Sequence, residues 1–324
     1  MNRRRFVAYV SLAFTVPAAN AQQPGVPPRI GLLWFRGAGT TQYVGMFREG
    51  MRSRGYADGK DVVIEERFMV ERYEELTEAA AALSREKVRV IVVYGSTAVQ
   101  AAYKATHHTP IVMASAGDPV KLGVARSLAR PGGNVTGLTS ISGDLSGKRL
   151  ELLKEIFPGV QRAAVLLYPG SSSEQDALQQ YRAAALALKI TVQPVEIRSP
   201  AEISSAIASI PGTGSQAALL VGSTMFNAYR KDMLVAMSKL RLPAIYTNSS
   251  FVEEGGLIAY SPDIAQLFHR VAGYVDKILK GAKPGDLPIE QPTKLELVVN
   301  LKTARALGIT IPKTVLLRAD KVID

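Results

Sequence analysis

The amino-acid sequence predicts an α/β protein made of two Rossmann-like lobes, each a doubly wound parallel sheet. Two observations lead to this prediction. Short apolar runs typical of buried parallel strands alternate with segments of helical periodicity along the chain. The alternation also occurs twice, and a Gly-Ser-Thr element follows a strand in each half. We therefore expect two lobes of related topology.

The first half opens with the apolar run RIGLLW, and a helix is expected after most of its strands. Gly37 and Gly39 mark a loop after the first strand, and Gly55 stops the first helix. The expected strands cover residues 29–34, 62–64, 88–94 and 110–114, and the expected helices cover 43–54, 73–86 and a segment ending at 104.

The second half repeats this pattern. VVYGST at 92–97 matches LLVGST at 219–224, and TPIV at 109–112 matches LPAI at 242–245. Every doubly wound sheet repeats itself to some degree, so this alternative explanation of the matches stays open. The expected strands cover 162–168, 190–197, 217–221 and 243–246, and the expected helices cover 174–188, 200–210 and a segment after the second Gly-Ser-Thr.

The N-terminus has the three parts of a secretory signal peptide. Three arginines at 3–5 precede a mostly apolar, uncharged run at 6–19, and A-N-A at 19–21 is a cleavage site. The rival interpretation is a membrane anchor, but a spanning helix needs about 20 apolar residues and polar side chains end this run early. We expect cleavage after Ala21, a mature chain starting at Gln22 and a periplasmic protein. The arginines are only a weak sign of twin-arginine export.

Composition excludes several classes of protein. The chain has no cysteine, which rules out disulfides, thiolate metal sites and a lipid-modified cysteine anchor. Its formal net charge is +11 at pH 7, but basic residues are scattered and are not interleaved with aromatic ones. We therefore expect no nucleic-acid partner.

The motifs of common enzymes are missing. The sequence has no G-x-x-x-x-G-K-[ST], no G-x-G-x-x-G after a strand, no H-E-x-x-H and no G-x-S-x-G. Two of the three histidines, His107 and His108, precede a strand at the edge of the sheet away from the expected site. We therefore predict no enzyme activity, no cofactor and no metal.

Ligands of open α/β sheets bind beyond the carboxyl ends of the strands, and two facing lobes form a cleft there. The candidate ligand-binding residues are those that follow the strands: Trp34, Gly95, Ser96, Thr97, Ser115, Asp118, Tyr168, Ser171, Ser223, Thr224, Tyr246 and Asn248.

Each kind of candidate has a binding role and an ordinary structural one. Ser and Thr at a helix start present hydroxyls beside free N–H groups, which suits a carboxylate, but they also serve as N-caps. Asp118 could bind an amine, or it could cap the turn that begins at Pro119. The aromatic residues Trp34, Tyr168 and Tyr246 could hold a planar ligand or pack in the core. For the aromatic residues, packing is the more common role.

Four segments resemble the ABC transporter substrate-binding family that includes tryptophan- and tyrosine-binding lipoproteins. The most specific is SLARPGGNVTG at 127–137; the others are KRLELLK at 148–154, EGGLIAY at 254–260 and NLKTARALGITIP at 300–312. This resemblance implies a type I periplasmic-binding-protein fold whose lobes close about a hinge, with the ligand held by the strand-end loops chosen above. It also implies that a late helix at 265–280 returns to the first lobe. Unlike those lipoproteins, this chain has no cysteine and should be free in the periplasm.

The implied division is a signal peptide at 1–21, an N-terminal lobe at 29–140 plus about 257–283, a C-terminal lobe at 141–256 plus about 284–300, and a C-terminal extension at 301–324. The implied function is to bind a small-molecule solute, such as an amino acid or an aromatic or carboxylate compound, as a monomer. The solute would then pass to an ABC permease in the inner membrane. Two alternatives stay open: a periplasmic sensor module for a membrane kinase or chemoreceptor, and a secreted hydrolase, for which no nucleophile–base pair is found.

Overall fold

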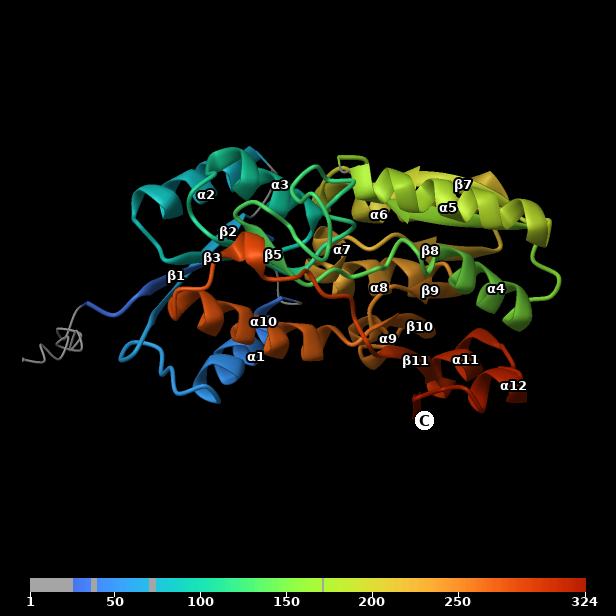
Figure 1. Cartoon of the computed structure of the whole chain (residues 1–324). Helices are drawn as coiled ribbons and strands as arrows, with labels where there is room; N and C mark the ends of the chain where they lie inside the picture. Colours follow the sequence, from blue (N-terminus) through green and yellow to red (C-terminus); the bar gives the residue numbers. More distant parts are fainter. Residues whose placement is uncertain (1–25, 36–39, 70–73, 171) are drawn as a thin grey trace, which may run out of the picture.

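A computed structural model describes residues 26–35, 40–69, 74–170 and 172–324. The segment expected to be a signal peptide lies outside the described residues. The described chain forms two α/β lobes that lie side by side (Figure 1). Each lobe has its own sheet, and the chain passes between the lobes more than once.

The first lobe contains a five-stranded, fully parallel sheet. Its inner strands β3 (Val90–Tyr94) and β4 (Ile111–Ser115) are buried along their whole length because helices cover both faces, which confirms the strand type expected from the sequence. In sheet order the strands are β2 (Val63–Met69), β1 (Arg29–Phe35), β3 (Val90–Tyr94), β4 (Ile111–Ser115) and β5 (Val135–Gly137).

Alternate residues of these strands face two different pairs of helices. One face packs against α1 (Thr41–Arg52) and α10 (Ile264–Leu279), and the other packs against α2 (Glu74–Arg85) and α3 (Ser96–Ala105). The strong apolar stripe of α10 explains why this late helix crosses back to the first lobe, as the family resemblance implied. Figure 1 shows α1 and α10 together on one side of the sheet.

The second lobe contains a seven-stranded sheet in which only the β10–β11 pair is antiparallel. Its strand order is β7 (Thr191–Glu196), β6 (Arg162–Leu167), β8 (Ala217–Leu220), β9 (Ala244–Tyr246), β10 (Ile258–Pro262), β11 (Leu295–Asn300) and β12 (Lys321–Ile323). Its α-helices are α4 (Ser146–Ile156), α5 (Ser172–Leu188), α6 (Ile203–Ser209), α7 (Thr224–Ala228), α8 (Arg230–Lys239), α9 (Ser249–Glu253), α11 (Leu301–Leu307) and α12 (Lys313–Leu316). Short 3-10 turns cover Pro200–Glu202, Ile210–Thr213 and, beside the first lobe, Pro284–Asp286.

The two sheets share one topology. The order β2-β1-β3-β4-β5 in the first lobe recurs as β7-β6-β8-β9-β10 in the second. The two Gly-Ser-Thr elements follow β3 and β8, which are equivalent central strands. The predicted repetition is therefore confirmed at the level of strand order.

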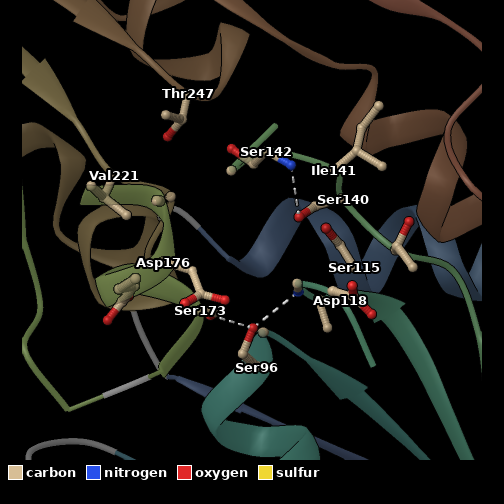
Figure 2. Close-up of a pocket in the computed structure, with 18 of the residues that line it drawn as sticks. Ser96, Ser115, Asp118, Ser140, Ile141, Ser142, Ser173, Asp176, Val221 and Thr247 are labelled. Atoms are coloured by element: carbon tan, nitrogen blue, oxygen red, sulfur yellow. Dashed lines mark hydrogen bonds between the residues drawn. The ribbon is translucent and has the colours of Figure 1, made fainter. Parts of the chain in front are cut away.

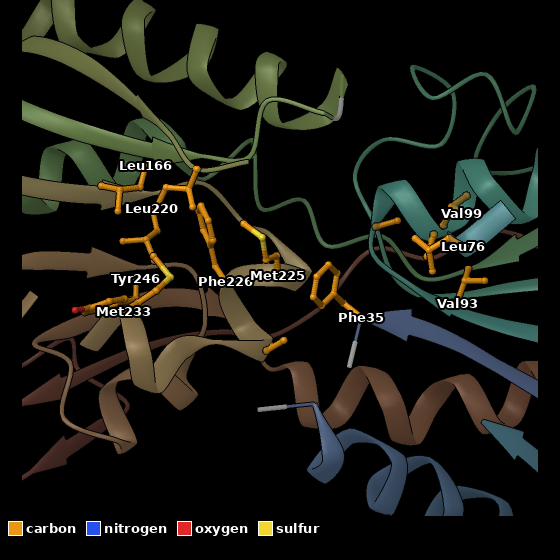
Figure 3. Packing of buried hydrophobic residues seen from close by; sticks show 14 of the residues in the cluster. Phe35, Leu76, Val93, Val99, Leu166, Leu220, Met225, Phe226, Met233 and Tyr246 are labelled. Carbon is orange, nitrogen blue, oxygen red and sulfur yellow. The ribbon is translucent and has the colours of Figure 1, made fainter. Parts of the chain in front are cut away.

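The cores of the two lobes are in contact. One cluster of buried residues runs from β3 and α3 of the first lobe to β8 and α8 of the second. Figure 3 shows Phe35, at the end of β1, beside Met225 and Phe226 of α7. The ring of Phe35 also meets Tyr229 edge-on, with centroids 6.0 Å apart. The lobes therefore pack against each other through apolar side chains next to the strand ends.

The boundaries between the lobes differ from the prediction at two places. The prediction assigned 257–283 to the first lobe, but β10 pairs with β9 in the second sheet and only α10 joins the first lobe. Residues 301–324 are not a separate extension, because β12 pairs with β11 and Val315 lies in the core of the second lobe. Both differences arise because strand pairing beyond β9 leaves no mark in the apolar pattern.

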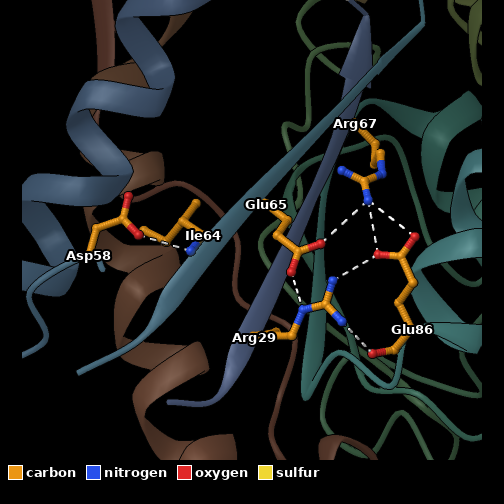
Figure 4. A network of polar contacts seen from close by, with 6 residues as sticks. All are labelled: Arg29, Asp58, Ile64, Glu65, Arg67 and Glu86. Carbon is orange, nitrogen blue, oxygen red and sulfur yellow. Dashed lines mark hydrogen bonds and ion pairs between the residues drawn. The ribbon is translucent and has the colours of Figure 1, made fainter. Parts of the chain in front are cut away.

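A network of ion pairs joins the outer strands of the first lobe to the end of α2 (Figure 4). Arg29 of β1 pairs with Glu65 of β2, and it donates to the carbonyl of Glu86 at 2.9 Å. Arg67 of β2 pairs with the carboxylate of Glu86 at 2.9 Å. These groups are partly exposed, so water screens them and each pair contributes little to stability. The network fixes the register of these elements far from the cleft.

Candidate ligand-binding site

A cleft lies between the lobes at the carboxyl ends of both sets of parallel strands, where open α/β sheets bind ligands. Its empty space, including the open mouth, is about 1230 Å³. Hydroxyl groups dominate the lining, which includes Ser96, Thr97, Ser115, Thr139, Ser140, Ser142, Ser172, Ser173, Ser223, Thr224 and Thr247. The cleft is therefore suited to a small polar solute.

Ser96 connects the two walls of the cleft. Its hydroxyl stands at the first position of α3, accepts a hydrogen bond from the amide of Gly117 at 3.0 Å and accepts another from the hydroxyl of Ser173 at 2.9 Å (Figure 2). Gly117 follows β4 in the first lobe, whereas Ser173 belongs to α5 in the second. The Ser96–Ser173 bond can form only when the lobes are close together.

The two Gly-Ser-Thr elements meet across the cleft. The backbone of Gly95 has φ +90°, a value that residues with a side chain rarely adopt. A Cβ atom at this position would lie 2.4 Å from Cγ2 of Thr224. Thr224 is the first residue of α7 in the opposite lobe. Glycine is therefore required at 95 both for the turn from β3 into α3 and for the approach of the lobes.

Two asparagines of the second lobe donate hydrogen bonds to buried tyrosines of the first. Asn227 donates to the hydroxyl of Tyr94 at 2.7 Å, and Asn248 donates to the hydroxyl of Tyr43 at 2.7 Å. Both tyrosine rings pack against Phe268 of α10. These contacts form a buried polar link between the lobes, so the described structure is a closed one.

The segment that first crosses between the lobes is held by Arg149 of α4, a fully buried side chain. Its guanidinium donates to the carbonyl of Ser142 at 2.6 Å and to that of Tyr260 at 2.8 Å. Ile141, next to Ser142, has φ +45°, which costs a β-branched residue about 1–3 kcal/mol. Arg149 therefore ties this crossover to the middle of β10, and the strained residue Ile141 lies in the crossover where it lines the cleft.

Asp118 has the structural role that the sequence left open. Its Oδ1 accepts hydrogen bonds from the amides of Val120 at 2.9 Å and Lys121 at 3.4 Å. The carboxylate therefore caps the turn after β4. The side chain is exposed and lines the cleft near its mouth, where the second oxygen stays available to a ligand.

Most of the predicted site residues come together in this cleft. Its lining contains Gly95, Ser96, Thr97, Ser115, Asp118, Ser223, Thr224 and Asn248. Ser171 lies outside the described residues.

The predicted aromatic residues do not line the cleft. Trp34 is 1% exposed and packs between Phe68 and Phe268 in the core of the first lobe. Tyr246 is buried and stacks on Phe251, with centroids 4.8 Å apart. Tyr168 is half-buried and packs against the cluster of buried residues that spans both lobes. Packing is therefore the role that the structure gives to these three side chains.

Several residues of the lining were not predicted from the sequence. Ser140, Ser142 and Asp144 come from the crossover after β5, whose path no periodic pattern revealed. Glu174 and Asp176 come from the first turns of α5. Only one feature of the sequence could have indicated Glu174 and Asp176. They follow β6 closely, at the start of a helix, and such helix starts lie near the strand ends.

Two features are absent from the described residues. Among the described residues, no group of three or more His, Cys, Asp and Glu side chains is arranged to hold a metal ion. Within the same part of the chain, no helix is long and apolar enough to span a membrane.

Two similarly ordered lobes with a cleft at their strand ends define the type I periplasmic binding proteins, and solved structures of that class share this fold. The chain matches the model of the ABC transporter substrate binding protein family over residues 35–323, and it belongs to that family. Both the fold class and the family predicted from the sequence are thereby confirmed.

Individual relatives cover most of the chain. A tyrosine-binding protein of Clostridioides difficile is 27% identical over 267 residues, which are 81% of this chain and 75% of that protein. A conserved domain protein from Vibrio cholerae has a TM-score of 0.85 and 26% identity, covering 92% of this chain and 100% of that one. The ABC domain from Streptococcus pneumonia in complex with L-Trp has a TM-score of 0.81 and 24% identity, again covering 92% of this chain and 100% of that one.

Proposed function

We propose that this protein is a periplasmic receptor that captures one small solute in the interlobe cleft and delivers it to an ABC permease in the inner membrane. Family membership supports the link to an ABC transporter. The observation that carries the proposal is the cleft itself, which both lobes build from strand-end hydroxyls and which their contacts close.

The cleft favours a solute with a carboxylate. The start of α3 offers the hydroxyls of Ser96 and Thr97 beside free N–H groups, a combination that suits an anion. Carboxylates of the lining, among them Asp118 at the mouth, would attract an amine. Relatives that bind tyrosine or L-Trp make an amino acid the leading candidate. Among the described residues, Tyr94 is the aromatic side chain in the lining, so the cleft suits polar solutes best.

Binding would work by a shift of population between open and closed lobes. The Ser96–Ser173 and Asn227–Tyr94 bonds join the two lobes in the closed form, and a solute that contacts both walls of the cleft would favour that form further. We propose that one monomer binds one solute. Small-angle scattering with and without solute should show compaction at constant mass.

The whole proposal can be tested on protein isolated from the periplasm. Native mass spectrometry of freshly purified protein identifies a retained solute, and N-terminal sequencing should start at Gln22. Deletion of the gene should abolish uptake of that solute by cells. A full-length chain in the inner membrane would contradict export, and undiminished uptake would contradict the delivery role.

A further inference from the structure

Glu174 is a buried carboxyl in the cleft wall formed by the second lobe. It lies in the first turn of α5, and it is 5% exposed. Among the described residues, no group is hydrogen-bonded to its Oε2 atom. The hydroxyl of Ser223, at the start of α7, is buried beside it and also lacks a hydrogen-bond partner within the described chain. Two buried polar groups therefore border the same part of the cleft with unused hydrogen-bonding capacity.

The fold itself gains nothing from this arrangement. A buried polar group without a partner costs about 1–3 kcal/mol, and more when it is charged. Burial raises the pKa of Glu174 well above the ordinary value of a glutamate, and the neighbouring hydroxyl of Ser223 offsets this only in part. A role for this carboxyl must therefore come from something that enters the cleft.

The other charged groups of the cleft favour a cation. Asp176 of α5, Asp144 of the first crossover and Asp118 after β4 all belong to the described lining. Lys121 is the lining cation among the described residues, and its Nζ lies 3.5 Å from the carboxylate of Asp176. Tyr94 is the remaining titratable group, and its hydroxyl is bonded to Asn227. Figure 2 shows Asp118 and Asp176 on opposite sides of the cleft.

We infer that Glu174, assisted by the hydroxyl of Ser223, receives the ammonium group of the solute and thereby selects amine-bearing solutes. This inference rests on the proposed function, because it concerns the same cleft. The amine is thereby assigned to the buried carboxyl of Glu174 in the first turn of α5. The exposed Asp118, in contrast, caps a turn at the mouth of the cleft. An ammonium supplies three donors, enough for both Glu174 and Ser223.

Binding then includes a proton transfer to solvent. In the closed cleft, burial raises the pKa of the Glu174 carboxyl and so favours its protonated form, whereas a bound ammonium favours the carboxylate. When an ammonium enters, the carboxyl loses that proton to water and the carboxylate pairs with the ammonium. The solute keeps its charge, one proton is released, and no other bond changes.

The test uses pairs of compounds that differ only in the amino group. L-Tyrosine is compared with 3-(4-hydroxyphenyl)propionate, and L-tryptophan is compared with indole-3-propionate. Binding to wild type, Glu174→Gln and the control Glu151→Gln is measured by calorimetry in two buffers that differ in ionisation enthalpy. We expect the wild type to bind the amine-bearing member at least tenfold tighter and to release close to one proton.

Glu174→Gln should lose at least tenfold in affinity for the amine and should release no proton, while its affinity for the amine-free partner stays unchanged. Glu151→Gln, which alters an exposed carboxylate of α4 outside the cleft lining, should change affinity less than threefold. The Glu174→Gln substitution keeps the shape of the side chain and removes a buried ionisable group, so its melting temperature should equal or exceed that of the wild type.

Several results would overturn the inference. Equal binding of amine-bearing and amine-free partners, or full affinity in Glu174→Gln, would exclude Glu174 as the ammonium site while leaving solute binding intact. Loss of affinity in Asp118→Asn but not in Glu174→Gln would assign the amine to the mouth instead. If the purified protein retains a solute that has no amine, the proposed function stands and the ammonium site fails. If neither these compounds nor any retained solute binds, both fail together.

Discussion

Replacing Gly95 with alanine should separate lobe closure from the stability of the fold. The new Cβ would lie 2.4 Å from Cγ2 of Thr224 in the opposite lobe, closer than real Cβ contacts. The backbone at φ +90° is strained for alanine whether the lobes are open or closed, whereas the contact with Thr224 exists only when they are closed. The substitution should therefore destabilise the closed form more than the open form.

The size of the effect follows from the cost of overpacking. Forcing one extra methyl into a packed contact costs about 1–3 kcal/mol. If solute binds the closed form, this cost appears in the affinity as a loss of roughly 5- to 150-fold, since 1.4 kcal/mol corresponds to a factor of ten. Backbone strain adds about 1–3 kcal/mol of lost folding stability but leaves affinity unchanged.

Two variants distinguish the clash from the strain. Gly55 has φ +87°, and an alanine methyl there would meet nothing within 4 Å, so Gly55→Ala should lower stability without changing affinity. Thr224→Ser removes Cγ2, and combined with Gly95→Ala it should restore most of the lost affinity. Calorimetry with the solute retained by the purified protein measures both effects.

Closure itself can be followed by fluorescence. The chain has no cysteine, so cysteines introduced at exposed Leu186 in α5 and Lys104 in α3 can be labelled selectively for energy transfer. Gly95→Ala should shift the unliganded protein toward the open form. Equal affinities for Gly95→Ala and Gly55→Ala, or no rescue by Thr224→Ser, would refute the argument that these helix starts limit closure.

Three other changes test the closed structure and its core. Tyr94→Phe leaves the side-chain amide of Asn227 without its acceptor, so calorimetry should show an affinity loss of about 1–3 kcal/mol; unchanged affinity would mean that this bond does not hold the lobes together. Trp34 is buried away from the cleft, so its emission should be blue in the free protein and should stay flat through a titration, in contrast to a cleft tryptophan. Burial, and next its hydrogen bond to Asp276, raises the pKa of Tyr56 to about 12, so its contribution to stability is complete below pH about 10 and is lost as pH rises through 12. Urea unfolding of wild type and Tyr56→Phe should show their stability difference shrinking across that range, and a constant difference would contradict it.

The sequence was sufficient to predict strands β1–β4 and β6–β9, several of the helices between them and a cleft at the strand ends, because most of these strands are apolar and glycines and hydroxyls follow them. It did not reveal β5 or β10–β12, which lie in the crossovers and at the edge of the second sheet. The sequence alone does not show whether a side chain at the end of a strand points into the core or into the cleft. Trp34 alternates with Leu33 and Phe35, and only the packing of α1 and α10 decides that its ring points into the core. Glu174 is likewise invisible, because a glutamate in the first turn of a helix is ordinarily exposed.

The return of α10 to the first lobe has a consequence for how the chain folds. The ring of Phe268 in α10 stacks on Tyr43 of α1, with centroids 4.9 Å apart, and seals one face of the first sheet. A nascent chain that has emerged only as far as β5 has all five strands of that sheet but exposes this apolar face to water. The first lobe therefore cannot complete its core during early synthesis, and it must wait until the second lobe has been made. An isolated fragment ending near residue 140 should be poorly folded and prone to aggregation. In the full chain, the two lobes should unfold together as one cooperative unit.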